Sequence, residues 1–331
     1  MEYRNLGKST LKLSAITFGA WAAGGWMWGG TQRKEATKAI QAGYDKGVTS
    51  IDTAPIYGQG TSEEIVGEAI KELPRDKIQI LTKYGMHWNS RDGEYYFSSN
   101  DNQGNPIDIY KFAGKKSVIK ECEDSLKRLG TDYIDLYQIH WPDSTTPIQE
   151  TMEAVSLLIE QGKVRYAGVC NYNVEQMKEA SKFIDLVSDQ VKYSMVSREI
   201  EDELIPYLIS KNRSVLAYSP LERGLLTGKM RPGHKFAEGD HRADVSFFKD
   251  ENVKQVNNFL QKIKHIADEK NASLAQLVIR WTLEQPGITI ALVGARNSEQ
   301  ALNNAKAIDL KLSPEEIDFI NKELNQLKLS I

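Results

Sequence analysis

The sequence predicts an α/β protein, a single (β/α)8 TIM barrel over residues 1–331 with an N-terminal hairpin and extra C-terminal helices. Eight short apolar runs end near residues 20, 54, 83, 140, 170, 193, 220 and 294, and segments with helical periodicity lie between them. No linker, low-complexity segment or compositional break divides the chain. Eight uninterrupted strand–helix units favour a closed parallel barrel over an open sheet.

Each expected strand is an apolar run between turn-forming residues, and each expected helix shows apolar residues three and four positions apart. Weak alternation over residues 3–16 predicts an opening hairpin. The expected strands are 15–20, 49–54, 78–82, 134–139, 164–169, 186–193, 214–218 and 288–293. The expected helices are 33–47, 61–70, 118–129, 148–161, 174–184, 202–211, 251–270 and 298–307, with one more after Ser273 and a last one after Ser313.

Three of these helices begin with a predicted capping box, in which a Ser or Thr and a residue three positions later satisfy each other's backbone N–H groups. The three pairs are Thr61 with Glu64, Ser273 with Gln276, and Ser313 with Glu316. Pro314, at the first helical position, strengthens the last of these predictions.

Three segments do not fit the strand–helix rhythm. Residues 21–30 combine three Trp with four Gly, a composition that predicts a mobile loop carrying aromatic surface. The polar stretches 85–114 and 221–250 are long for connections between barrel elements. Connections of that length are usually functional, so we expect both to border the site.

Composition narrows the possible partners and the compartment. A net charge of −3 and a pI near 6.1 argue against a nucleic-acid binder. Two cysteines form no disulfide framework, which favours a reducing compartment. Neither a signal peptide nor an apolar run of about 20 residues is evident. We therefore expect a cytoplasmic protein without nucleic-acid or membrane partners.

Four reactive side chains are expected at one end of the barrel. Asp52, Lys83 and His140 are the last polar residues of their strands, and Tyr57 follows one of them. Because the carboxyl ends of barrel strands face one mouth, the four side chains should converge there. Singly, each also fits a structural role, as a turn former, a surface residue or a packed histidine. Their joint placement favours a catalytic set.

The chemistry that suits this set is protonation of a carbonyl oxygen. A phenol has a pKa of about 10, and a nearby ammonium group favours its ionised form, so Lys83 should lower the pKa of Tyr57. Asp52 would hold Lys83 in its charged state, and His140 would orient a substrate carbonyl. A hydride from a nicotinamide cofactor would then reduce the carbonyl carbon.

The late strand ends indicate where a cofactor lies. Residues 218–229 combine Tyr, Gly, Arg and Lys, and barrels often bind phosphate near strands seven and eight. Arg296 stands at the start of a helix, where a guanidinium can form a forked contact with a phosphate. Gly58–Gly60 lacks the third glycine of the dinucleotide fingerprint, and Gly224–Lys229 is one residue short of a P-loop. His234 and His241 have no matching ligand set, so we predict no metal site.

These stretches together resemble the aldo-keto reductase superfamily over essentially the whole chain, and most closely its bacterial general-stress, NADPH-dependent members. The resemblance is carried by residues 52–58, 81–83, 134–143, 168–172, 219–229 and 294–304, and by the Trp26–Gly30 segment. It implies a metal-free barrel that reduces aldehydes or ketones with NADPH. Tyr57 is then the general acid, tuned by Lys83 and Asp52, and His140 orients the carbonyl.

The resemblance also implies a cofactor site. Asn171 and Gln190 would hold the nicotinamide carboxamide, and Tyr218 would stack on the ring. Ser219, Leu221, Lys229 and Arg242 would contact the pyrophosphate, Arg296 and Gln300 the 2′-phosphate, and Asn304 the adenine. The full expected set is Ala20, Trp21, Asp52, Cys170, Asn171, Gln190, Tyr218, Ser219, Pro220, Leu221, Arg223, Gly224, Leu225, Lys229, Arg242, Gly294, Ala295, Arg296, Gln300, Asn303 and Asn304. Cys170 replaces the family's usual Ser, and Asn303 replaces a frequent acidic residue.

We expect a substrate pocket lined by aromatic side chains around the tetrad, namely Trp21, Trp28, Tyr57, Trp88, His140 and Trp141. Two other functions remain open. Potassium-channel β subunits share this family and act mainly as cofactor-sensing partners, although they tend to depart at the position of His140. A barrel lyase or hydrolase would use Lys83 as a Schiff-base nucleophile, which requires an uncharged lysine.

Overall fold

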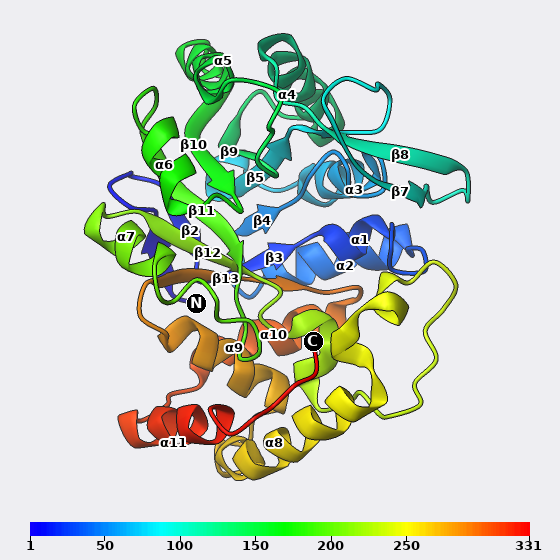
Figure 1. Cartoon of the computed structure of the whole chain (residues 1–331), viewed down its shortest axis with the longest axis vertical. Helices are drawn as coiled ribbons and strands as arrows, with labels where there is room; N and C mark the ends of the chain where they lie inside the picture. The colour runs from blue at the N-terminus through cyan, green and yellow to red at the C-terminus, as the bar shows by residue number, and fades with distance from the viewer.

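The computed structural model describes residues 1–331 and contains a closed barrel of eight parallel strands (Figure 1). Neighbours in the barrel follow chain order, and the last strand pairs with the first from Ala291–Ile16 to Gly294–Gly19. The predicted fold class is therefore confirmed. The strands are β3 (Ile16–Gly19), β4 (Ser50–Asp52), β5 (Gln79–Tyr84), β9 (Ile134–Ile139), β10 (Val164–Cys170), β11 (Leu186–Lys192), β12 (Ser214–Tyr218) and β13 (Ile288–Gly294).

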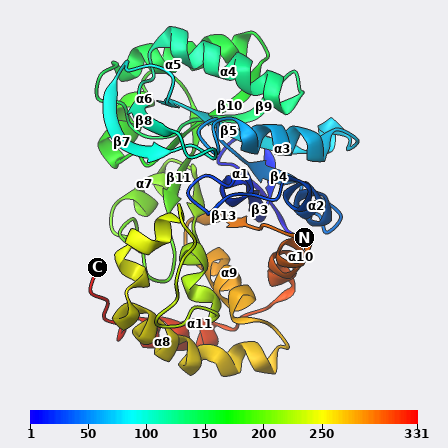
Figure 2. The same cartoon turned by 90° about the vertical axis from the view of Figure 1, so that its right-hand side faces the viewer.

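Helices alternate with these strands and cover the outside of the barrel (Figures 1 and 2). They are α2 (Arg33–Tyr44), α3 (Thr61–Ile70), α4 (Lys115–Leu129), α5 (Ile148–Glu160), α6 (Val174–Ala180), α7 (Leu204–Ser210), α8 (Asp250–Glu269), α9 (Leu274–Glu284), α10 (Ser298–Ala305) and α11 (Pro314–Leu324). The extra helices α8 and α11 lie side by side at the lower end of the view in Figure 1. None of the helices combines the length and the apolar character that crossing a membrane requires.

The predicted hairpin closes the amino-terminal end of the barrel. It consists of β1 (Tyr3–Asn5) and β2 (Lys12–Ser14), paired antiparallel. Leu6, Leu11 and Leu13 are buried against apolar side chains inside the barrel, among them Leu81 and Leu136. With this end filled by leucines, the opposite end is the one at which polar side chains gather.

The stretch 85–114, for which the sequence predicts no conformation, is not an irregular loop. It forms a three-stranded antiparallel sheet of β6 (Met86–His87), β8 (Pro106–Lys111) and β7 (Glu94–Asn100), in that order. The β7–β8 hairpin stands out from the barrel, and in Figure 2 it lies on the same face as α1 (Trp21–Gly24). The other long stretch contains the 3-10 helices η2 (Glu222–Thr227), η3 (His241–Asp244) and η4 (Ser246–Phe248).

Two of the three predicted capping boxes are confirmed and one is wrong. Ser273 with Gln276 and Ser313 with Glu316 make both reciprocal bonds. At α3, however, the N-cap is Gly60, and no side-chain cap bond forms. Gly60 has a φ of 97°, a left-handed conformation that already brings Thr61 into the first turn. The structure has a third capping box, Asn173 with Gln176 at α6, which was not predicted.

Residues 21–30 were expected to carry aromatic surface, which is wrong for Trp26. Its side chain is only 4% exposed, and its indole Nε1 donates to the carbonyl oxygen of Asn100 at 3.0 Å. Its ring stacks on Phe97 of β7 with a centroid distance of 6.1 Å. The segment is therefore packed against the hairpin, and it opens with the single helical turn α1.

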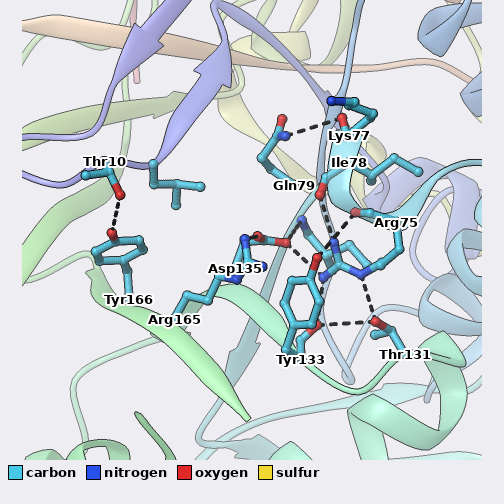
Figure 3. Close-up of polar contacts among 12 residues, drawn as sticks. Thr10, Arg75, Lys77, Ile78, Gln79, Thr131, Tyr133, Asp135, Arg165 and Tyr166 are labelled. Atoms are coloured by element: carbon cyan, nitrogen blue, oxygen red, sulfur yellow. Dashed lines mark hydrogen bonds and ion pairs between the residues drawn. The ribbon is translucent and has the colours of Figure 1, made fainter. Parts of the chain in front are cut away.

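A buried ion pair joins three strands at the amino-terminal end of the barrel (Figure 3). Asp135 of β9 is 1% exposed and accepts from Arg75 Nη2 at 2.8 Å, from the backbone N–H of Ile80 at 2.9 Å and from Arg165 Nη1 at 3.3 Å. The two guanidinium carbons lie 3.8 and 4.0 Å from the centre of the Tyr133 ring. This network ties β5, β9 and β10 together far from the polar mouth.

We expect Asp135→Ala to lower the free energy of unfolding by about 3 kcal/mol, because it leaves the buried N–H of Ile80 without its acceptor and removes the carboxylate partner of two guanidinium groups. The loss is measured by urea unfolding. The matched control is Asp132→Ala, at an exposed position, which should change stability by less than about 0.5 kcal/mol. Equal stability of the two variants would contradict the importance of this network.

Candidate active site

The ends of β4, β5 and β9 bring the predicted tetrad together at one mouth of the barrel. Asp52 is the last residue of β4, Lys83 lies in β5, and His140 directly follows β9. Tyr57 lies in the turn between β4 and α3. Asp52 and Leu81 are partners in the β4–β5 register, and Lys83 and Gln138 are partners in the β5–β9 register. The shared barrel register therefore positions the reactive groups.

Lys83 and Asp52 form a buried ion pair. The Lys83 side chain is 0% exposed, and its Nζ donates to Asp52 Oδ1 at 2.6 Å and to the carbonyl oxygen of Thr53 at 2.9 Å. The second carboxylate oxygen of Asp52 accepts from Gln190 Nε2 at 2.8 Å and from Gln138 Nε2 at 3.4 Å. Burying two charges is costly unless their remaining bonding capacity is met, and these two amides meet it. Gln138 was not among the predicted residues.

Tyr57 is held between the other members of the set. Its hydroxyl lies 3.4 Å from His140 Nε2, and Lys83 Nζ lies 5.0 Å from the centre of its ring. The turn behind it needs glycine, since Gly58 has a φ of 67° and a Cβ there would come within 2.4 Å of the carbonyl oxygen of Gly24. The backbone after Tyr57 is thus packed directly on α1.

The pKa values of the tetrad differ from expectation at one residue, Tyr57. Burial opposes the charged form of Lys83, but Asp52 raises its pKa above the ordinary value. Burial also raises the pKa of Tyr57 to about 12, although Lys83 acts in the opposite direction. The predicted lowering of the Tyr57 pKa is therefore wrong for its net value, while the effect of Lys83 has the predicted sign. Burial, and then the charge of Lys83, hold the pKa of His140 well below its usual value.

Asn171 and Tyr218 form a second layer behind His140. Asn171 Nδ2 donates to the carbonyl oxygen of His140 at 3.1 Å, and the Tyr218 hydroxyl donates to Asn171 Oδ1 at 3.0 Å. Cys170, at the end of β10, is 1% exposed. Gln190, expected to face a nicotinamide, uses one N–H of its amide to bond Asp52, so its second N–H and its Oε1 are left for a ligand.

The expected phosphate-binding residues follow β12 and lead into η2. Arg223 has a φ of 55°, and its buried Nε has no partner within the protein. Arg242 is already paired with Asp240 through Nε at 2.9 Å and Nη2 at 2.6 Å. Lys229 is exposed. Ser219, Pro220, Leu221, Gly224 and Leu225 lie in or next to this turn, and Leu225 is fully buried in the core, so it can offer only backbone groups.

The remaining expected cofactor residues surround β13 and the start of α10. Arg296 is exposed, and its Nη2 donates to the carbonyl oxygen of Gly30 at 3.0 Å. Gln300 accepts from the backbone N–H of Arg296 at 2.9 Å. Asn304 donates to the carbonyl oxygen of Gly294 at 3.1 Å. Asn303 instead accepts from Gln276 on α9, which occupies its side-chain oxygen. Ala20 and Ala295 are buried beside these strand ends.

The expected aromatic residues gather beside Tyr57. The Trp21 ring stacks on Tyr57 with a centroid distance of 6.0 Å and meets Trp28 edge to face at 5.4 Å. Trp88 and Trp141 pack on the apolar cluster that also includes Tyr57. The buried indole nitrogens of Trp21 and Trp28, like Arg223 Nε, have no acceptor within the protein. Three orphaned donors near the mouth fit a bound group rich in acceptors, such as a phosphorylated nicotinamide cofactor.

Several residues at this mouth are not predicted by any pattern in the sequence. His241 lies between two indoles, with ring distances of 4.9 Å to Trp21 and 5.2 Å to Trp28, and its Nδ1 bonds the carbonyl oxygen of Met27 at 2.6 Å. Asp189, next to Gln190 on β11, is fully buried, and burial raises its pKa well above the ordinary value. The Tyr96 ring of β7 lies 5.7 Å from the ring of Trp141, the neighbour of His140. Their positions depend on long-range packing, and no local pattern marks them.

Fold and site together place four ionisable side chains at the carboxyl ends of the strands of a parallel barrel, the position typical of active sites in barrel enzymes. The family model described as "Aldo/keto reductase family" matches residues 15–325, and the chain belongs to that family. Membership confirms the enzyme class expected from the sequence, an NADP(H)-dependent oxidoreductase.

Individual relatives agree with this assignment. The chain is 39% identical to the aldo-keto reductase YhdN of Bacillus subtilis, covering 91% of this chain and 86% of the relative. It is 35% identical to an NADH-specific methylglyoxal reductase of Escherichia coli, covering 93% and 94%. A probable voltage-gated potassium channel subunit beta of Arabidopsis thaliana is 34% identical, with 97% and 96% covered.

Solved structures show the same fold. The glycerol dehydrogenase of Gluconobacter oxydans superposes with a TM-score of 0.87 at 35% identity, covering 98% of this chain and 95% of that one. An aldo-keto reductase from Klebsiella pneumoniae in complex with NADPH superposes with a TM-score of 0.72 at 30% identity, covering 97% and 95%. The barrel and the family thus have independent support.

The neutral state of His140 predicts how stability changes with pH. Its pKa in the folded protein lies below the unfolded value of about 6.5, so the unfolded chain binds more protons as pH falls. Below that pH this one group should lower the free energy of unfolding by up to about 1.4 kcal/mol per pH unit. His140→Gln should lose less stability between pH 7 and pH 5 than the wild type. His265→Gln, at an exposed position, should follow the wild type.

Proposed function

We propose that this protein reduces aldehydes or ketones to alcohols with NADPH, using Tyr57 as the general acid. The observation that carries the proposal is the position of the Tyr57 hydroxyl, 3.4 Å from a neutral His140 Nε2 and in front of the buried Lys83–Asp52 pair. A carbonyl oxygen that bonds both the phenol and the imidazole would be held by two donors. We propose further that residues 1–331 form one functional domain and that the protein is cytoplasmic.

The chain's own groups have distinct tasks in this mechanism. When bound, NADPH supplies the hydride that reduces the carbonyl carbon. Tyr57 donates its hydroxyl proton to the carbonyl oxygen, on which negative charge develops. The Lys83 ammonium favours the resulting phenolate, and Asp52 keeps Lys83 charged in a site from which water is excluded. His140, neutral at physiological pH, orients the carbonyl by a hydrogen bond without competing as an acid.

The cofactor is proposed to extend from the nicotinamide side at Asn171, Gln190 and Tyr218 to the adenine side at α10. The unpaired Arg223 Nε and the exposed Lys229 suit the pyrophosphate, and Arg242 would have to share its pairing with Asp240. Arg296, Gln300 and Asn304 lie where a 2′-phosphate and adenine would be bound. Asn303 is the weakest member of the expected set, because α9 occupies its side chain.

The two alternative functions receive less support. A Schiff-base mechanism needs an uncharged lysine, whereas the ion pair with Asp52 raises the pKa of Lys83. Potassium-channel β subunits form a related branch of the family, to which the Arabidopsis relative belongs. A regulatory function is therefore the second candidate. The presence of all four tetrad residues in hydrogen-bonding or stacking range favours catalysis. Failure to bind NADPH, or to oxidise it with a reactive aldehyde such as nitrobenzaldehyde, would sink the reductase proposal.

Replacement of the proposed acid gives a direct test. Tyr57→Phe should lower kcat by about a thousandfold, because a positioned general acid contributes about 10²–10⁴ in rate. The dissociation constant for NADPH, measured by fluorescence titration, should remain within about twofold, since the ring stays in place. Tyr44→Phe on the outer helix α2 is the control and should retain wild-type turnover. Unchanged turnover in Tyr57→Phe would remove Tyr57 from the mechanism.

The choice between NADPH and NADH is tested at Arg296. Arg296→Ala should weaken NADPH binding about tenfold, the effect of losing one forked guanidinium–phosphate contact of about 1.4 kcal/mol. NADH, which lacks the 2′-phosphate, should bind both proteins equally. Calorimetric titration with each cofactor measures the two constants. An equal loss for both cofactors would show that Arg296 acts through the fold, for example through its bond to Gly30.

A further inference from the structure

The β7–β8 hairpin is fastened to the turn that carries Tyr57. At its tip, Asn102 Nδ2 donates to the carbonyl oxygen of Gly24 at 2.8 Å, and Trp26 Nε1 donates to the carbonyl oxygen of Asn100 at 3.0 Å. The same Gly24 oxygen packs against Gly58, the residue after Tyr57. The tip therefore bonds to the backbone that supports the proposed acid.

The base of the hairpin is fixed as well. Lys111 of β8 pairs with Glu94 of β7 at 2.8 Å, and Glu94 also accepts from the Ser144 hydroxyl at 2.6 Å. Ser144 belongs to the segment that follows His140 and Trp141. A hairpin held at both ends presents its side chains in defined positions, which a recognition surface requires.

An apolar cluster runs from Tyr57 into the hairpin without a break. Its buried members include Trp26, Met86 and Ile109, and the half-buried rings of Tyr57, Trp88, Phe97 and Trp141 pack on it. All three strands of the extra sheet thus contribute to the same cluster as the proposed acid. The cluster supports the face from which a substrate would approach the tetrad.

Tyr96 is an aromatic side chain of this hairpin that stays partly exposed to solvent. It is 36% exposed, and its ring lies 5.7 Å from that of Trp141, the neighbour of His140. Lys111 Nζ lies 5.0 Å from the ring centre and Phe97 packs edge to face at 5.1 Å, so the ring is held from behind. The preceding residue, Tyr95, is 53% exposed and contacts Tyr110 of the hairpin instead.

We propose that Tyr96 is a specificity-determining residue, whose ring, with that of Trp141, stacks on the flat apolar part of the substrate. The substrate class is then aromatic aldehydes. The inference rests on the reductase function proposed above and adds to it a recognition element outside the barrel. A fixed, half-exposed aromatic ring gains area and quadrupole contacts from another ring but little from a short aliphatic chain. Loss of the Tyr96 ring should therefore raise the KM for aromatic substrates.

The test compares three variants, Tyr96→Ala, Tyr96→Phe and the matched control Tyr95→Ala, on 4-nitrobenzaldehyde and propanal with saturating NADPH. Tyr96→Ala should raise the KM for 4-nitrobenzaldehyde about tenfold with little change in kcat, a loss consistent with one aromatic contact. Its kinetics with propanal should match those of the wild type, which also shows that the variant is folded. Tyr96→Phe, which keeps the ring, and Tyr95→Ala, which keeps Tyr96, should behave as the wild type.

Three results would overturn the inference while leaving the reductase function intact. They are equal changes for both aldehydes in Tyr96→Ala, no change for either, or the same selective loss in Tyr95→Ala. A selective loss in Tyr96→Phe as large as that in Tyr96→Ala would assign recognition to the hydroxyl and not to ring stacking. If the wild type reduces neither aldehyde, the reductase proposal itself fails.

Discussion

The buried ion pair between Lys83 and Asp52 is the interaction on which the mouth of this barrel depends. Removing two charges from water is expensive, and their attraction offsets the cost only when their other bonding positions are filled. Here Thr53 fills one position of the ammonium, and Gln190 and Gln138 fill positions of the carboxylate. The three residues around the pair come from the end of β4 and from β9 and β11. A closed barrel is needed to bring those strands to one point.

The same ion pair sets the state of the groups in front of it. With its charge secured by Asp52, Lys83 favours phenolate formation at Tyr57 and disfavours a second cation at His140. Burial nevertheless keeps the pKa of Tyr57 at about 12, so the phenol holds its proton until negative charge develops on a neighbouring oxygen. A strong acid at this position would lose its proton to solvent before it was needed. Burial and the ion pair thus have opposite effects, and a proton donor requires both.

How much of this arrangement could be predicted follows from the range of each interaction. The strand ends and the tetrad could be predicted from the sequence, because apolar runs mark buried strands and the ends of parallel strands meet at one mouth. The capping box at Thr61 failed because the left-handed backbone of Gly60 overrode a local side-chain pattern. The β7–β8 hairpin was missed because its strand Glu94–Asn100 is mostly polar and is stabilised by Trp26, about 70 residues earlier, and by cross-strand pairs. Likewise, nothing near Gln190 in the sequence indicates that it bonds Asp52.

Chemistry and selectivity therefore depend on different parts of the molecule. The reactive groups are fixed by barrel register, where a shift of one residue would turn every side chain to the opposite face and break the ion pair. The hairpin has its own ladder and is attached to the mouth by an apolar cluster and by side-chain bonds of Asn102, Trp26 and Glu94. Its exposed residues can change without disturbing the barrel. A side chain that selects substrates is for that reason better placed at Tyr96, on the hairpin, than on any of the eight strands.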